Sequence, residues 1–211
     1  MRTALLVGLN ALLLTGSLGC GGSGGSSSGS TTPTAPTAPV TPSNPTTASP
    51  PSLTAAFVAP DSAVAFYVFG ATLPSGVLNP TWEIETASPS VPVLAAMSGR
   101  VVSVTPTSQG DLTVILTAPS DDTYALVHDH VTDVRVTVGQ MVTAGMQIGV
   151  VGRLNNGRGR TELQLNRRRP EPTVAVCPRT VYTTGINEQF QAAAQRLNGN
   201  STTCLSDTVV P

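Results

Sequence analysis

The sequence contains no lysine, and all 11 of its basic residues are arginine. Biotin, lipoate and Schiff-base cofactors are carried on a lysine amine, and a P-loop uses a lysine to contact phosphate, so these chemistries are excluded. The 12 acidic residues leave a formal net charge of -1. Nucleic-acid binding requires a strong positive field, and we therefore expect no nucleic-acid partner.

Histidine and cysteine are also scarce, at 2 and 3 residues. Zinc sites normally use three or more protein ligands, so two histidines do not make one without other residues. Apart from residues 4–14, no apolar run approaches the roughly 20 residues that span a bilayer. We therefore expect a protein that does not cross a membrane.

Residues 1–19 combine a positive start at Arg2, a short apolar run and a small-residue segment that leads to Cys20. This arrangement resembles the lipobox of bacterial lipoproteins, whose cysteine is diacylated, although Ser17 stands where leucine is usual. We expect residues 1–19 to be a signal peptide. We also expect an exported protein, lipid-anchored through Cys20 to a membrane of the bacterial cell envelope. An ordinary secretory signal with an unrelated cysteine is the alternative.

Residues 20–52 are almost entirely glycine, serine, threonine, alanine and proline. Such a segment lacks the apolar surface that would offset the entropy of folding, so it predicts a disordered tether. A glycosylated stalk is an alternative function for it. The remaining chain has the length of one ordinary domain, which we divide into a β domain at 53–170 and a C-terminal extension at 171–211.

Two cysteines, Cys177 and Cys204, remain after Cys20 is assigned to lipidation. In an oxidising compartment they predict a disulfide, with two free buried thiols as the alternative. Between them, apolar residues recur at helical spacing, followed by a glycine stop signal: Ile186, Phe190, Ala193, Leu197 and Gly199. We expect a short C-terminal helix held back by the bridge.

The centre of the chain consists of short runs rich in valine, isoleucine and threonine, separated by glycine, proline, aspartate and serine. The runs are residues 63–69, 91–96, 100–106, 112–118, 124–131 and 147–153. Short strands at this spacing predict a mainly β barrel or sandwich.

Two segments within this centre have a recognisable pattern. Residues 93–102 read as an alanine-rich strand, a glycine turn and a valine-rich strand, and residues 136–152 follow His130 with a regular series of glycines. Together they resemble the lysostaphin/LytM-type zinc peptidoglycan endopeptidases over about residues 82–166. The resemblance implies a barrel-sandwich hybrid fold, and we expect each glycine to permit a tight turn or a positive φ. Biotinyl carrier domains share this pattern, but they need the lysine that is absent here.

The resemblance also implies where a zinc site should be. In the family, a His-x-x-x-Asp motif and the last histidine of a His-x-His motif hold zinc, and a further histidine assists the bound water. Here Thr81 and Glu85 stand at the first two ligand positions and Gln164 at the third. His130 matches the assisting histidine. We therefore expect no zinc cofactor, and His130 to be a catalytic relic.

A rebuilt metal site is the alternative. His128 and His130 are two residues apart, so on a strand they would point to the same face, with Glu85 or Glu162 as a carboxylate partner. In the simpler interpretation His130 is hydrogen-bonded in the old cleft and His128 lies beside it at the surface.

We expect four further residues to line a groove on the same domain. These are Trp82, Tyr124, Arg160 and Gln164. Glu83 and Glu85 could form an acid/base pair, although a solvated strand edge is the more common arrangement. The arginines at 158, 160 and 167–169 could contact peptide carboxylates or anionic lipid, with solvated loop charges as the alternative.

Three functions remain open from the sequence. The leading hypothesis is an envelope lipoprotein with a catalytically degenerate LytM-like domain that binds peptidoglycan or regulates a cell-wall hydrolase. The second is a divergent zinc metalloendopeptidase that uses His128, His130 and a glutamate to cleave peptidoglycan cross-links. The third is a structural adaptor module of an envelope complex.

Overall fold

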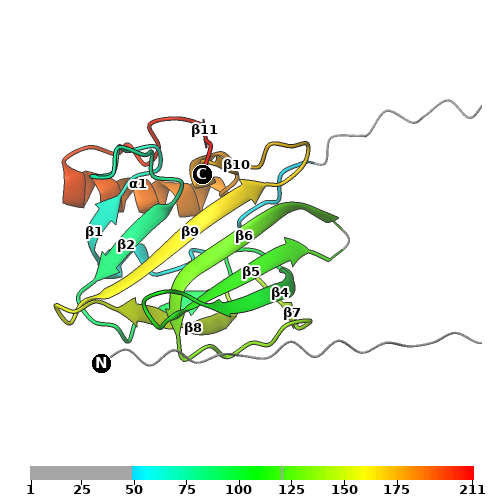
Figure 1. Ribbon diagram of the computed structural model, residues 1–211. Helices are drawn as coiled ribbons and strands as arrows, with labels where there is room; N and C mark the ends of the chain where they lie inside the picture. Colours follow the sequence, from blue (N-terminus) through cyan, green and yellow to red (C-terminus); the bar gives the residue numbers. More distant parts are fainter. Residues whose placement is uncertain (1–48, 120) are drawn as a thin grey trace, which may run out of the picture. The chain divides into compact units, whose positions relative to one another are not determined.

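The computed structural model describes residues 49–119 and 121–211 (Figure 1). The predicted signal peptide, Cys20 and nearly all of the predicted tether lie outside this part. In the described ranges, no helix is both long and apolar enough to cross a membrane. Leu53, at the start of the predicted β domain, is fully buried, and its amide donates to the carbonyl of Val181.

The described chain is built on one 11-stranded sheet in which all pairings between strands are antiparallel. Its strands are β1 (Ala63–Tyr67), β2 (Trp82–Thr86), β3 (Pro92–Leu94), β4 (Gly99–Pro106), β5 (Leu112–Ala118), β6 (Asp121–Thr132), β7 (Met141–Val142), β8 (Gln147–Arg153), β9 (Gly159–Arg167), β10 (Val174–Val176) and β11 (Thr208–Val209). Two 3-10 helices, η1 (Pro60–Ser62) and η2 (Pro178–Thr180), and one α-helix, α1 (Thr184–Asn198), complete it. The mainly β fold and the single short C-terminal helix are confirmed.

The strand order β1-β2-β9-β8-β6-β5-β4-β7 places β9 at the centre of the architecture. β9 pairs with β2 on one side and with β6 and β8 on the other, and it also pairs with β10. Figure 1 shows β9 as the long yellow strand between β2 and β6. Residues far apart in the sequence therefore meet on neighbouring strands.

Strands β2 and β9 each have one buried and one polar face. Along β2, Trp82, Ile84 and Thr86 are buried while Glu83 and Glu85 are half-buried. Strand β9 alternates in the same way. This period of two is that of a strand whose one side packs on a core.

The hydrophobic core continues under most of the sheet, and its aromatic part lies between β1, β2 and the helix α1. Aromatic rings fill it: Phe57, Phe66, Trp82, Tyr182 and Phe190 lie with neighbouring centroids 4.9–6.2 Å apart. Phe190 comes from α1, whose C-cap residue, Gly199, is in the left-handed conformation at φ 73°. Burying the apolar side of α1 against these rings is what stabilises so short a helix.

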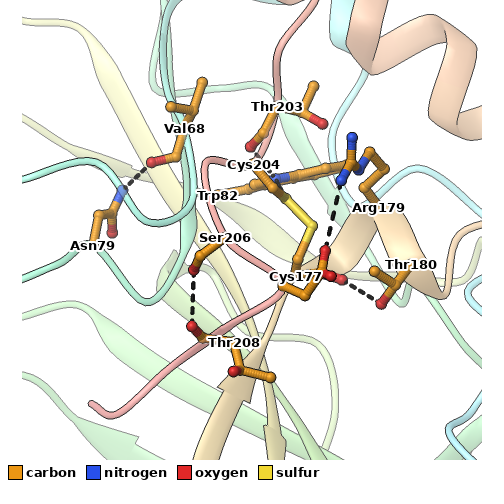
Figure 2. The surroundings of a disulfide bond; sticks show 11 residues. Val68, Asn79, Trp82, Cys177, Arg179, Thr180, Thr203, Cys204, Ser206 and Thr208 are labelled. Atoms are coloured by element: carbon orange, nitrogen blue, oxygen red, sulfur yellow. Dashed lines mark hydrogen bonds and ion pairs between the residues drawn. A yellow bond between two sulfur atoms is a disulfide. The ribbon is translucent and has the colours of Figure 1, made fainter.

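The predicted disulfide between Cys177 and Cys204 is present and spans a sequence separation of 27 residues (Figure 2). Trp82 lies beside it, with Nε1 donating to the carbonyl of Thr203 at 2.9 Å and 3.4 Å from Sγ of Cys204. The bridge therefore joins the two ends of the segment that contains α1, at a point where that segment contacts β2.

Glycine is required within residues 136–152 for two different physical reasons. Gly145 has a positive φ of 84°, as expected. Gly149 does not, and a Cβ there would lie 2.6 Å from the carbonyl oxygen of Thr132 and overlap the side chain of Val131. The expectation of a turn or a positive φ at every glycine is wrong, because Gly149 is needed for the close approach of β8 to β6.

Candidate functional site

One surface of the sheet formed by β2, β6 and β9 is polar. Residues directly opposite each other in antiparallel strands point to the same face, and the register places Glu83 and Asp129 on either side of Glu162. It also places Glu85 opposite Arg160. We call this surface the site face, and it consists of Glu83, Glu85, Asp129, Arg160, Glu162 and Gln164, all half-buried.

His130 joins the site face through an uncommon backbone conformation. Its φ is 54°, in the left-handed region, where the pairing of β5 with β6 shifts register. The ring is held from both sides: Nδ1 lies 2.8 Å from the carboxylate of Asp111, and Nε2 lies 3.3 Å from that of Glu162. A side chain that is rarely found at this φ is kept there by its contacts, which is typical of functional sites.

His128 points away from His130, into the core. It is fully buried, its ring lies 6.5 Å from that of Phe57, and neither ring nitrogen has a hydrogen-bond partner among the described residues. Burial lowers the pKa of His128 to about 3. The prediction that His128 and His130 share a face is wrong, because the positive φ at His130 interrupts the alternation, and so is the placement of His128 at the surface.

The charges around His130 shift its pKa and that of Glu162 in opposite directions. Burial by itself lowers the pKa of His130, but hydrogen bonds to Glu162 and Asp111 outweigh burial and raise it overall. Burial by itself raises the pKa of Glu162, but the contacts with His130 and Arg160 outweigh burial and lower it. Each shift favours the charged form of its group, as expected for a half-buried ion pair.

Arg160 lies at the centre of this group. Its guanidinium is 3.4 Å from Glu162 and 3.6 Å from Glu83, and it also contacts Nε2 of His130. Burial raises the pKa of Glu83, as does the neighbouring charge of Glu162, against the opposing effect of Arg160. The guanidinium therefore neutralises carboxylates that would otherwise repel one another.

Glu85 is occupied elsewhere on the same face. It is 3.0 Å from the guanidinium of Arg158 and accepts a hydrogen bond from Tyr67 at 3.2 Å. The interpretation of Glu83 and Glu85 as a solvated strand edge is wrong, because β2 is paired on both sides, with β1 and β9. The interpretation as a solvated loop charge is wrong for Arg160, which lies in β9 and pairs with Glu83 and Glu162. Arg158 is an exposed residue of the loop before β9, as expected, and it pairs with Glu85.

The residues proposed for a rebuilt metal site do not all come together. His130 and Glu162 do, but His128 is in the core and Glu85 is paired with Arg158. Instead, Asp129, His130 and Glu162 offer ligand atoms that all lie within 4.8 Å of one another. Asp129 was missed, although its place between the two histidines was a signal that could have singled it out.

The three positions that hold zinc in the resembling family do not form a zinc site here. Thr81 is buried and donates to Oδ1 of Asn79 at 2.8 Å, and Gln164 donates to Oδ1 of Asn166 at 2.7 Å. Neither side chain is a usual zinc ligand, and Glu85 alone offers a carboxylate. The donor set at these positions does not fit the metal.

Of the four residues assigned to a groove, two lie on the site face. Arg160 and Gln164 do so. Trp82 is fully buried and Tyr124 is 9% exposed, and both belong to the hydrophobic core, so the groove assignment is wrong for these two. Single aromatic residues on the strands of a β domain are used here for packing.

A pocket of about 500 Å³ opens beside Glu83. The turn that connects β1 to β2 forms one wall, through Leu73 and Pro74, and Tyr67 lines it from the end of β1. The lining is largely apolar, while Glu83 belongs to both the pocket and the site face. The pocket and the site face therefore form one continuous surface with an apolar and a charged part.

One family model and several solved structures are similar to parts of this chain. The model of peptidase family M23 matches residues 82–175. The solution structure of lysostaphin is 20% identical, covers 56% of this chain and 52% of its own, and has a TM-score of 0.46. The catalytic domain of the prophage-encoded M23 protein EnpA from Enterococcus faecalis, solved as a point mutant, is 21% identical. The match covers 54% of this chain and 88% of the EnpA chain, with a TM-score of 0.43.

Csd3 from Helicobacter pylori is 18% identical, covers 71% of this chain and 40% of its own, and has a TM-score of 0.47. This chain spans about half the length of the lysostaphin structure. No curated protein matches the sequence.

Proposed function

Since residues 82–175 form a domain of peptidase family M23, we propose that the chain is an envelope lipoprotein that binds peptidoglycan through its site face without cutting it. Family membership supports a role connected with peptidoglycan. The observation that carries the proposal is that Thr81 and Gln164, which the resemblance places at zinc-binding positions, are not usual zinc ligands and bond to Asn79 and Asn166 instead. Export and anchoring through Cys20 belong to the same proposal.

Loss of hydrolysis follows from what the reaction requires. A zinc hydrolase holds its metal with about three protein ligands and leaves one position open for the water whose pKa the metal lowers. In this chain the remaining carboxylate, Glu85, is neutralised by Arg158 at 3.0 Å. The resemblance places His130 at the position of the water-assisting histidine, but its Nε2 contacts Arg160 and Glu162.

Binding does not require the metal. The site face presents carboxylates, a guanidinium and an amide in a fixed arrangement, and these groups suit the amides, carboxylates and amines of peptidoglycan stem peptides. The pocket beside Glu83 adds an apolar surface for a side chain. A few placed polar groups beside an apolar pocket are the usual composition of a ligand site.

The test is co-sedimentation of the purified full chain with intact sacculi, using Cys20→Ala so that the protein stays soluble. We expect binding, and no release of soluble muropeptides. The double variant Glu83→Gln with Gln164→Ala should lower the bound fraction several-fold, because both residues lie on the site face. Arg179→Ala is the matched control, since Arg179 pairs with Asp207 outside that face and its side chain is 41% exposed.

Other results would select another function. Sacculus digestion that His130→Ala abolishes would establish the zinc endopeptidase. Absence of co-sedimentation, together with co-purification of a cell-wall hydrolase or an envelope complex, would replace peptidoglycan binding by a regulatory or adaptor role.

A further inference from the structure

The guanidinium of Arg160 contacts three side chains of kinds that bind metals, and two of them, His130 and Glu162, belong to the cluster that they form with Asp129. It contacts Nε2 of His130 and is 3.4 Å from Glu162, and its other amino group is 3.6 Å from Glu83. A guanidinium has only donors and stays charged at any ordinary pH. It therefore acts towards these acceptors as a fixed positive ion.

We propose that Arg160 is a built-in cation that closes a latent metal site formed by Asp129, His130 and Glu162, and that removing this arginine opens the site to zinc. This site is distinct from the family's ligand positions at Thr81, Glu85 and Gln164. The inference does not depend on whether the site face binds peptidoglycan.

The distances between the three ligand residues are close to those of a zinc site. Zinc bonds of about 2.0–2.2 Å place two tetrahedral ligand atoms roughly 3.3–3.5 Å apart. Nε2 of His130 and the carboxylate of Glu162 are already separated by 3.3 Å. All three ligand atoms lie within 4.8 Å, so small rotations of the side chains bring Asp129 to the metal.

The surroundings of the ligands resemble those of an occupied metal site. A metal-binding histidine usually donates its other ring nitrogen to a carboxylate, which fixes the ring and frees the coordinating nitrogen. Nδ1 of His130 lies 2.8 Å from Asp111 in this way, and Asp111 is itself bonded by Thr107. Asp129 is held by Thr113, whose hydroxyl donates to it at 2.6 Å.

The chemistry of the ligands indicates which ion would enter. One imidazole nitrogen and two carboxylate oxygens suit zinc and similar first-row dications, whereas magnesium and calcium prefer oxygen ligands alone. Without Arg160, the carboxylates of Glu83, Asp129 and Glu162 would face one another without the guanidinium that now contacts Glu83 and Glu162. A half-buried charge left without its partner is strongly destabilising, and a divalent ion would restore the balance.

The experiment is a zinc titration of the metal-stripped full chain, with Cys20→Ala in every variant, by calorimetry and by thermal unfolding. Arg160→Met keeps the bulk of the side chain and removes its charge. We expect zinc affinity to rise at least about tenfold over the parent, and the Tm of the variant, unlike that of the parent, to rise with zinc concentration. Arg160→Ser, which leaves more room at the site, should behave in the same way.

The controls separate a specific site from a change in surface charge. Arg158→Met removes a charge that pairs with Glu85 and should leave zinc affinity unchanged. Adding His130→Ala to Arg160→Met should abolish the gain, and Arg160→Lys should keep the site closed. Tight zinc binding by the parent, or no gain in both Arg160→Met and Arg160→Ser, would overturn the inference. Sacculus binding by the parent is unaffected by either result.

Discussion

The ring of His128 is buried in the aromatic core with no hydrogen-bond partner for either nitrogen among residues 49–119 and 121–211. Leaving a buried polar atom unsatisfied costs about 1–3 kcal/mol. The buried ring remains neutral because its pKa falls to about 3. The residue therefore links stability to pH without taking part in the site face.

We predict that His128 weakens the fold in acid. Its pKa is lowered from 6.5 to about 3 by burial, so between these values the unfolded chain binds a proton that the folded chain does not. The free energy of unfolding should fall by up to about 1.4 kcal/mol for each pH unit below 6.5. Urea unfolding of the parent and His128→Leu at pH 7.5, 6 and 5 checks this. The variant should lose less stability in acid, and equal slopes would contradict the prediction.

His130 has the opposite effect. Its pKa is raised overall, because hydrogen bonds to Glu162 and Asp111 outweigh burial. Its contribution is complete below the unfolded pKa and is lost as pH rises through the folded pKa. In a chelating buffer, His130→Gln should therefore be less stable than the parent at pH 6 but lose less stability between pH 7 and pH 9. A parent and variant that respond identically over this range would exclude the linkage.

The two histidines show where sequence reasoning reached its limit at this scale. A spacing of two residues predicts one face only if the strand is regular, and a single φ of 54° at His130 separates the pair. No residue type in the sequence announces that conformation, since a positive φ is uncommon outside glycine. The contacts that hold it, from Asp111 and Glu162, come from other strands.

At the level of elements, the sequence predicted strands by their valine, isoleucine and threonine content. Strands β1, β3, β4, β5, β6 and β8 were located in this way, but β2 and β9 were not. More than half of the positions in these two are polar, because one face of each carries the site face. The glutamates and arginines that give the site its charge also make β2 and β9 unlike strands in composition. Only the family resemblance indicated strands at these positions.

Strand β8 provides a test of close backbone packing. A Cβ at Gly149 would lie 2.6 Å from the carbonyl oxygen of Thr132, so Gly149→Ala must push β8 away from β6. Overpacking of this kind costs about 1–3 kcal/mol, measured as the free energy of unfolding in urea.

The matched control for this variant is Gly185→Ala in α1, where a Cβ would meet nothing within 4 Å. That change should be neutral or stabilising by up to about 1 kcal/mol, because alanine favours the helix. Equal effects of the two substitutions would contradict the close approach.

For the whole molecule, the expected lipid on Cys20 would hold the domain at a membrane. Cys20 lies outside the described residues, and its lipidation stays a prediction from the signal-like segment before it. Cys20→Ala should move the protein from the membrane fraction to the soluble fraction of fractionated cells, because a lipid chain gains about 0.8 kcal/mol for each buried CH₂. A variant as membrane-associated as the parent would exclude this anchor.

Because Trp82 contacts the disulfide, its fluorescence should report whether the disulfide is oxidised or reduced. Trp82 is the single tryptophan of the sequence, and its indole nitrogen lies 3.4 Å from Sγ of Cys204. A disulfide in contact with an excited indole accepts an electron from it and quenches its fluorescence. The oxidised native protein should therefore emit weakly near its tryptophan maximum, and reduction of the Cys177–Cys204 bond in the folded state should brighten it without any added dye.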